Sequence, residues 1–369
     1  MKKATTTPPP ARHIVLEMSA TRNRHVGVGE VCHQLALQFA AEAPRLRETY
    51  GIEFCFIAPK GLKGAYGDDV RYLSLGGFPR RQLLKFRPGR IDLFHALHQF
   101  AAVKYMACAR HNLLTVHDIN FMVEKEGKAL ARYIRRFRGK FRRTDHLAFI
   151  SRFAREDTER HFDLGGRPVR VVYNGVTDLG DRPPVDLDRH NLPANYLFHI
   201  SSLLPKKNPA LLIEMMRHLP DRHLVLAGNW RTEYAATLTA RIEALGLTNI
   251  TPLHHVTDEE KAALYAGCKG FLFPSLCEGF GLPPLEAMRM GKPAFLSTLT
   301  SLPEVGGPHA YYWPELEPEA MARRVEDGLR DFYADPQKAA DARTWAGQFS
   351  WEKCAREYID YYLDILGLT

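Results

Sequence analysis

The sequence predicts an α/β protein with two mostly parallel sheets arranged in series along the chain. Short apolar runs suited to buried strands alternate with longer amphipathic stretches suited to helices, which is the pattern of βαβ units. A chain of 369 residues is too long for one ordinary core. Residues 178–195 are rich in Pro, Asp and Gly and predict a linker between the two series. We therefore expect two Rossmann-like domains that face each other across a cleft.

Ten apolar runs are the predicted strands. They cover residues 14–18, 54–57, 91–94, 113–116, 147–150 and 169–172 in the first domain, and 196–200, 224–226, 271–273 and 294–296 in the second. Helical patterns are expected over residues 210–219 and 351–366. Ligands bind such open sheets outside the carboxyl ends of the strands, so residues that directly follow these runs are the functional candidates.

The composition is that of a soluble globular protein, with 45% hydrophobic and 25% charged residues. The six cysteines are scattered and form no Cys-x-x-Cys pair, which favours reduced thiols over a disulfide framework or a zinc site. The apolar run after the polar segment 1–12 is too short for a signal peptide, and no stretch has the length needed to cross a bilayer. We expect a cytoplasmic protein.

The net charge of +8 is concentrated in residues 128–143, which hold eight basic residues and no acid. Apolar residues recur there at helical spacing, so the segment predicts a basic amphipathic helix. Three interpretations are open. The helix packs on the core with a solvated basic back, or it contacts anionic lipid headgroups at the inner face of the plasma membrane. Nucleic acid is the third and least supported, because no recognised binding motif accompanies the charge.

Residues 274–293 place two carboxylates, Glu278 and Glu286, on either side of a glycine-bearing loop that opens a helix. Gly279 and Gly281 let backbone amides approach a ligand closely, and the positive end of the helix favours an anion. A carboxylate can accept from two hydroxyls at once, so Glu286 beside such an anion site suits a vicinal diol such as ribose. The pattern predicts a pocket for a diol attached to a phosphate.

The plain alternative is that Glu286 is only an acid in a first helical turn, where the helix dipole favours it. The whole string, Pro-Ser-Leu-x-Glu-Gly-Phe-Gly-Leu-Pro-x-Leu-Glu-Ala-Met from residue 274, resembles the Glu-x7-Glu signature of retaining glycosyltransferases of the GT-B type, family 4. The resemblance implies that Glu278 contacts sugar hydroxyls, that Glu286 binds the ribose, and that Gly279, Phe280 and Gly281 belong to the donor site.

Lys206 and Lys207 lie between a predicted strand and a predicted helix, where a loop delivers cations to the cleft. Asn208 suits the N-cap of that helix and Pro209 its first position. Lys207 resembles the family's lysine that binds the donor diphosphate. Ser201-Ser202 replaces the Gly-Arg that often opens this loop, which leaves Lys206 as the substitute for the second cation. Without the motif, two exposed lysines would indicate only solubility.

His117 ends a predicted strand, and a neutral imidazole there can donate to a sugar hydroxyl or steady a transition state. The alternative is a histidine that merely caps the strand. His117-Asp118 resembles the family's pair beside the donor sugar. Gly27 and Gly29 match the family's Gly-x-Gly loop that approaches the donor phosphates or the acceptor, with a helix expected from about Val31. A single Gly-x-Gly is otherwise most often a plain turn.

Many sugar transferases hold a divalent cation with an Asp-x-Asp pair. Such a string, Asp186-Leu-Asp188, lies in the polar linker and not after an apolar strand, so we interpret it as solvated loop and expect no metal. Lys207, loop amides and the helix dipole would then meet the charge of the leaving group.

The resemblance implies a retaining, metal-independent hexosyltransferase without a cofactor. It would use a UDP-, GDP- or ADP-sugar and a saccharide or lipid-linked acceptor, in bacterial polysaccharide or lipopolysaccharide synthesis. We expect an acceptor-binding domain over residues 1–182 and a nucleotide-sugar-binding domain over residues 190–348. A final helix within residues 349–369 is expected to cross back onto the first domain. The alternatives are a nucleotide-sugar epimerase and a non-catalytic nucleotide-sugar-binding protein of the same fold.

Overall fold

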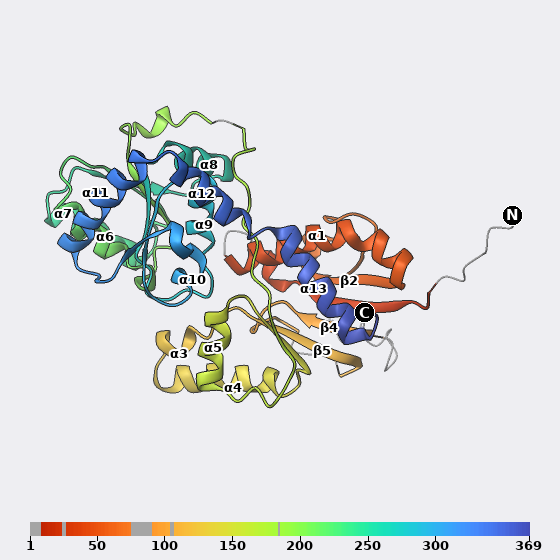
Figure 1. Ribbon diagram of the computed structural model, residues 1–369. Coiled ribbons are helices and arrows are strands. Elements are labelled where there is room, and N and C mark those ends of the chain that lie inside the picture. The colour runs from red at the N-terminus through yellow and green to blue at the C-terminus, as the bar shows by residue number, and fades with distance from the viewer. Residues whose placement is uncertain (1–8, 24–26, 75–90, 104–106, 184) are drawn as a thin grey trace, which may run out of the picture. The chain divides into compact units, whose positions relative to one another are not determined.

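The computed structural model describes residues 9–23, 27–74, 91–103, 107–183 and 185–369 (Figure 1). The chain forms two compact units. Unit 1 comprises Met1–Gly175 and Trp351–Thr369, and unit 2 comprises Val176–Ser350. The division falls before the predicted linker, because Val176 N–H donates to the Phe349 carbonyl at 2.8 Å and so joins the second unit.

Unit 1 is built on a parallel sheet with the strand order β3-β2-β1-β4-β5-β6-β7. The strands are β1 (Arg12–Glu17), β2 (Ile52–Ala58), β3 (Arg71–Ser74), β4 (Ile91–Ala96), β5 (Ala109–Val116), β6 (His146–Phe149) and β7 (Val169–Val171). β1 lies between β2 and β4, with Ile14 opposite Phe54 on one side and Leu93 on the other. Because every strand pair is parallel, the carboxyl ends share one edge of the sheet.

Helices cover this sheet. Those in the described part of unit 1 are α1 (Gly27–Tyr50), α3 (Phe121–Glu124), α4 (Gly127–Phe141), α5 (Arg152–His161) and α13 (Trp351–Leu366). α13, from the far end of the chain, packs beside α1 and against β4 (Figure 1). A buried polar network ties it to the sheet: the two ring nitrogens of His95 lie 2.7 Å from Tyr362 Oη and 2.8 Å from Thr115 Oγ1.

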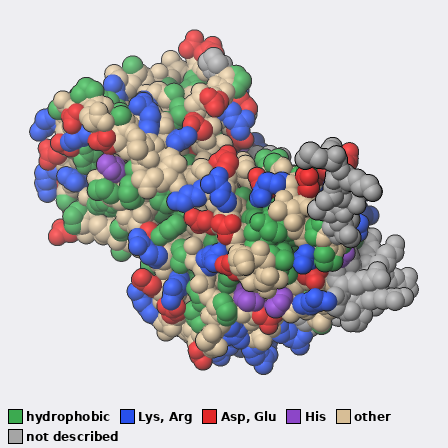
Figure 2. Space-filling view, turned by 45° about the vertical axis from the view of Figure 1, so that its right-hand side comes forward, with side chains coloured by type: hydrophobic (Ala, Val, Ile, Leu, Met, Phe, Trp, Pro, Cys, Tyr) green, Lys and Arg blue, Asp and Glu red, His purple; other side chains and the backbone are tan. Residues whose placement is uncertain are grey.

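α4 is the predicted basic amphipathic helix, and its apolar stripe packs on the core of unit 1. Phe137 and Phe141 are buried, and Leu130, Tyr133 and Ile134 pack against the same cluster. Seven of the eight basic residues in 128–143 are exposed. Lys and Arg side chains gather along the lower edge of unit 1, where Figure 1 draws α4 (Figure 2). Lys140 is the exception, because its Nζ donates to the Ala101 carbonyl at 2.7 Å inside the unit.

Unit 2 has a second parallel sheet, with the order β10-β9-β8-β11-β12-β13. Its strands are β8 (Leu197–Ile200), β9 (Leu224–Gly228), β10 (Ile250–His254), β11 (Gly270–Phe273), β12 (Ala294–Ser297) and β13 (Tyr311–Trp313). Its helices are α6 (Pro209–Met216), α7 (Glu233–Ala244), α8 (Asp258–Gly267), α9 (Leu282–Arg289), α10 (Leu302–Gly306), α11 (Pro318–Ala334) and α12 (Gln337–Gly347). The central strands β8 and β11 are almost wholly buried, as continuous apolar runs predict.

The α/β class and the two parallel sheets are therefore confirmed, whereas strands β3, β10 and β13 are not among the predicted ones. α6 begins at Pro209 as expected. Asn208 precedes it in a left-handed conformation with φ 56° and makes no side-chain cap hydrogen bond, so the expectation of a side-chain cap is wrong. Within the described residues, no helix combines the length and the apolar character needed to cross a bilayer.

Candidate donor site and the His117 loop

The loop from Pro274 to Gly281 leaves the carboxyl end of β11 and leads into α9. It carries Glu278, while Glu286 lies on α9 itself. Gly281 occupies the N-cap position with φ 126°, and a Cβ there would lie 3.0 Å from Leu302 Cδ2. Glycine is therefore required at this position both by the backbone conformation and by the neighbouring side chain.

Glu278 and Lys207 form an ion pair between the loop after β11 and the loop after β8. Both side chains are largely buried, with 12% and 16% of their surfaces exposed. Lys207 Nζ also lies 5.5 Å from the ring centroid of Phe273, the last residue of β11. An ammonium has three donors, so pairing with one carboxylate oxygen leaves donors that a phosphate could accept from. The structure thus brings together two residues that the sequence assigned to one ligand.

Lys206 connects the same two loops through its backbone. Its carbonyl accepts from Leu276 N–H at 2.8 Å and from Ser275 Oγ at 3.2 Å. The predicted role of its ammonium as a second cation stays a prediction. The carbonyl contacts show that the residues beside Lys207 hold the Glu278 loop in place.

Glu286 is held by two residues of α8 that the sequence reasoning missed. Lys261 Nζ lies 2.9 Å from Glu286 Oε1, and Tyr265 Oη donates to Glu286 Oε2 at 3.0 Å. Burial raises the pKa of Tyr265 well above its usual range, so the phenol remains protonated and donates. Lys261 and Tyr265 are four residues apart and share one helix face, which was the available signal. α8 is fixed by a capping box between Thr257 and Glu260.

The loop after β12 supports the Glu278 loop from the other side. Glu278 N–H donates to Thr300 Oγ1 at 3.1 Å, and Ser301 Oγ donates to the carbonyls of Glu278 and Phe280 at 3.1 and 2.7 Å. The Phe280 side chain is buried and meets the Phe349 ring edge-on, with centroids 5.8 Å apart. The Phe280 ring therefore faces the core, and only the backbone groups of Phe280 are suited to contact a ligand. Gly279 and Gly281 have no side chain, so they too could contact a ligand only through their backbone.

His117 follows β5 at the carboxyl edge of the sheet in unit 1. Its Nε2 lies 2.8 Å from the Leu97 carbonyl, and burial lowers the pKa of the imidazole to about 4. Because a carbonyl can only accept, Nε2 carries the hydrogen and Nδ1 carries the lone pair. The neutral ring is therefore an acceptor toward further groups. The expectation that it donates to a sugar hydroxyl is wrong for this tautomer.

Gly27 and Gly29 lie inside α1, which begins at Gly27 and not near Val31 as predicted. A Cβ at Gly29 would lie 1.9 Å from the Asn23 carbonyl oxygen, so glycine is needed where the helix crosses the segment before it. Gly27 is exposed, and among the described residues none lies within 4 Å of where its Cβ would be. The first turn of α1 has backbone N–H groups without helical partners, as any helix start does, so a phosphate contact at these glycines stays a prediction.

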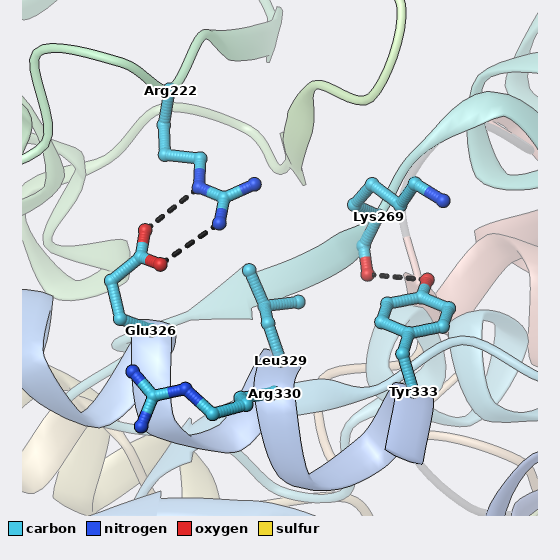
Figure 3. A pocket seen from close by; sticks show the side chains of 6 residues that line it. All are labelled: Arg222, Lys269, Glu326, Leu329, Arg330 and Tyr333. Carbon is cyan, nitrogen blue, oxygen red and sulfur yellow. Dashed lines mark hydrogen bonds and ion pairs between the residues drawn. The ribbon is translucent and has the colours of Figure 1, made fainter. Parts of the chain in front are cut away.

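A separate hollow lies at the opposite edge of the unit 2 sheet, beside the residues that precede β9 and β11, with a volume of about 380 Å³ (Figure 3). It is lined by Arg222, Lys269, Glu326, Leu329, Arg330 and Tyr333. Arg222 Nε and Nη2 donate to the two oxygens of Glu326 at 2.7 and 2.8 Å, which neutralises the charge of Arg222. This hollow is distinct from the predicted donor site.

Side chains that bind metals do not cluster in the described part of the chain. Among those residues, no group of three or more His, Cys, Asp or Glu side chains could hold a metal ion. Asp186 and Asp188 are exposed, and Asp186 Oδ1 accepts from the backbone N–H of Asp188 at 2.7 Å. That contact is a local turn, in keeping with the interpretation of this pair as solvated loop.

Two family models match the chain in tandem. The model described as Glycosyltransferase Family 4 matches residues 27–178, and the one described as Glycosyl transferases group 1 matches residues 188–343. The first match lies almost wholly in unit 1 and the second in unit 2.

Among curated relatives, the serotype-specific mannosyltransferase WbdA of Escherichia coli is 30% identical over 240 residues, which are 61% of this chain and 29% of WbdA. The chain thus spans less than a third of that relative. The O-antigen chain mannosyltransferase B of Escherichia coli is 29% identical over 77% of each chain. Among solved structures, Anabaena HepE in complex with UDP and glucose has a TM-score of 0.71 and 20% identity, covering 96% of this chain and all of HepE. That likeness concerns the fold.

Proposed function

The chain belongs to the group 1, family 4 glycosyltransferases of GT-B fold, and from that membership we propose that it transfers a mannosyl group from a nucleotide-diphosphate sugar to a hydroxyl. The acceptor is a saccharide or a lipid-linked saccharide of a bacterial surface polysaccharide or lipopolysaccharide. The names of the two mannosyltransferase relatives support the sugar and the pathway class. The observation that carries the proposal is the presence of two ion pairs, Lys207–Glu278 and Lys261–Glu286, beside the carboxyl ends of the strands of unit 2.

In this proposal the donor lies along the carboxyl edge of unit 2. Glu286 accepts from the ribose hydroxyls, using lone pairs that Lys261 and Tyr265 leave open. Lys207 and backbone N–H groups of the Gly279–Gly281 loop bind the diphosphate, and Glu278 binds hydroxyls of the sugar. The charge that develops on the leaving phosphate is then met by the ammonium and amides, without a metal ion.

Transfer proceeds with retention in this proposal. The acceptor oxygen forms the new bond to the anomeric carbon on the face from which the nucleotide diphosphate departs, and the departing phosphate takes the acceptor's proton. The proposal needs no enzymic nucleophile, in keeping with the pairing of Glu278 to Lys207. His117 contributes an acceptor nitrogen toward a sugar hydroxyl.

A peripheral contact with the inner face of the plasma membrane is part of the proposal. The exposed basic side chains of α4 supply the attraction to anionic headgroups, at about 1 kcal/mol for each cation near the surface. The apolar stripe of α4 packs against the core of unit 1 and is not available to lipid. The membrane contact would therefore be electrostatic, and it would weaken as salt is added.

A donor-by-acceptor screen tests the proposal. Purified protein is incubated with UDP-, GDP- and ADP-sugars, mannose donors included, and with saccharide and lipid-linked acceptors, and products are read by mass spectrometry. A product heavier by one hexose is expected, and NMR of its anomeric proton reports retention or inversion. If donors bind but no acceptor gains mass, a non-catalytic binding protein is the better description. If no donor binds at all, the transferase proposal fails.

A further inference from the structure

Gln99 is buried, and its amide bridges two consecutive backbone groups just beyond β5. Its Oε1 accepts from the backbone N–H of His117 at 3.0 Å, and its Nε2 donates to the carbonyl of Asp118 at 2.8 Å. Because the N–H only donates and the carbonyl only accepts, these partners fix which end of the amide is oxygen. Asn would be one methylene too short, and a carboxylate would lack the donor.

The loop that carries Gln99 also fixes the imidazole of His117. Leu97, two residues earlier, accepts from His117 Nε2 at 2.8 Å. The His98 ring packs edge-on against the His117 ring, with centroids 5.5 Å apart. Three hydrogen bonds from one short loop thus set the position of the strand end and the tautomer of the ring. Nδ1 is left as the acceptor nitrogen.

Buried charges on both sides anchor this loop. Lys140 Nζ donates to the Ala101 carbonyl at 2.7 Å. Glu17 Oε1 accepts from the backbone N–H groups of Ala102 and Val103 at 3.2 and 3.4 Å. Polar groups buried in this way are costly unless they are paired, so the loop has little freedom to move. The anchoring suits a segment whose task is to hold another residue.

We propose that Gln99 is a positioning residue for glycosyl transfer, holding His117 so that Nδ1 accepts from a sugar hydroxyl in the transition state. The inference rests on the proposed transferase function and adds a residue that the Glu-x7-Glu motif does not include. Gln99 touches no reacting atom itself. Its loss displaces the acceptor nitrogen and lowers kcat, while nucleotide binding in unit 2 is unaffected.

Gln99→Met keeps the length of the side chain and removes both hydrogen bonds. We expect kcat to fall by about ten- to a hundredfold, with the Kd of the free nucleotide unchanged. Val15→Ala is the matched control, because Val15 is buried in β1 of the same sheet and does not contact the Gln99 loop through any described hydrogen bond. It should lower the melting temperature and leave kcat near that of the native protein. The inference is overturned if Gln99→Met has the same kcat as the native protein, or if Val15→Ala loses as much kcat as Gln99→Met.

Gln99→Glu gives a sharper readout. A protonated carboxyl accepts from His117 N–H through its carbonyl and donates to the Asp118 carbonyl through its hydroxyl, which restores the native pattern. Burial favours that neutral form. The charged and titratable groups around the site are His98, His117, Asp118, Glu17, Lys140 and Arg136. We divide the kcat of each variant by that of the native protein at the same pH. For Gln99→Glu this ratio should increase as the pH is lowered from about 8 to about 6, whereas for Gln99→Met it should not change with pH. Parallel curves for the two variants overturn the inference.

A readout without turnover separates this inference from the proposed function. The ¹⁵N shifts of the His117 ring distinguish hydrogen on Nε2 from hydrogen on Nδ1, and we expect a single Nε2–H tautomer that becomes mixed in Gln99→Met. If native protein transfers no sugar but the tautomer changes in this way, the proposed function fails and the positioning by Gln99 stands. If the tautomer is unchanged, the positioning inference fails regardless of activity.

Discussion

Lys261 Nζ lies 2.9 Å from Glu286 Oε1, while Tyr265 donates to the other oxygen of the same carboxylate. These two contacts hold the Glu286 carboxylate in one orientation. Only 11% of its side chain is exposed. A carboxylate that must accept from a vicinal diol benefits from being fixed in advance, because no ordering remains to be done when the ligand arrives. Helix α8 is thus the support for the nucleotide end of the predicted donor site.

Lys261→Met should weaken nucleotide binding by about tenfold. It leaves Glu286 as a mostly buried charge without its cation, and such a carboxylate is free to turn or to take up a proton. Isothermal titration with UDP, GDP and ADP measures the effect. Lys338→Met is the matched control, because Lys338 forms an ion pair with Asp331 on the surface of the same unit. Equal affinities for the two variants would remove Lys261 from the site.

Glu278→Gln should abolish transfer and leave nucleotide affinity within about twofold of the native value. The amide oxygen can still accept from Lys207, but the negative charge that opposes the ammonium is gone. Transfer is measured by mass spectrometry and affinity by titration calorimetry. Glu319→Gln, which breaks the exposed ion pair with Arg323 on α11, is the control and should retain activity. An active Glu278→Gln enzyme would exclude Glu278 from the site.

The sequence predicted the central strands of both sheets and missed three strands at their edges. β3, β10 and β13 each have one neighbour, so they are not covered on all sides and need no continuous apolar run. β10 contains Pro252, which an edge strand tolerates and a central strand does not. An apolar run in the sequence therefore reveals a strand only where the strand is buried. The edge strand β7 was found because valines flank its single arginine.

The residues of the candidate site likewise divide into those that the sequence analysis found and those that it missed. Glu278, Glu286 and Lys207 were predictable because they belong to one contiguous string or to a recognisable loop. Lys261 and Thr300 were missed, because each contributes through the fold, from a helix or a loop distant in sequence. Lys140 shows a related limit: it belongs to a basic run, where side chains are usually solvated, yet its ammonium donates to a carbonyl inside unit 1. A charge pattern cannot show which member of the run turns inward.

Acid should destabilise the protein through three buried histidines. Burial lowers the pKa of His95 to about 3 and those of His117 and His199 to about 4, below the usual value near 6.5. The unfolded chain therefore binds protons that the folded chain excludes, and the stability is full above pH 6.5 and falls as the pH drops toward the folded values. His95→Gln should reduce this slope by up to about 1.4 kcal/mol per pH unit between pH 6 and pH 4.5. Urea unfolding at several pH values measures it, and an unchanged slope contradicts the assignment.

The exposed arginines of α4 and of the two residues that follow it offer a direct test of the membrane contact. Replacing Arg135, Arg142 and Arg143 with Gln removes three positive charges from the solvent face and leaves the apolar stripe on the core, so folding should be retained. Arg136 is kept, because its guanidinium lies 5.2 Å from the ring centroid of Phe100 and supports the loop beside His117. The triple variant should lose most of its sedimentation with vesicles of anionic phospholipid at low salt, and native binding should fall as salt is raised. A control that replaces Arg323, Arg324 and Arg330 on α11 removes the same charge from unit 2. If both variants lose binding equally, the attraction is a net-charge effect, and if neither does, α4 has only its core-packing role.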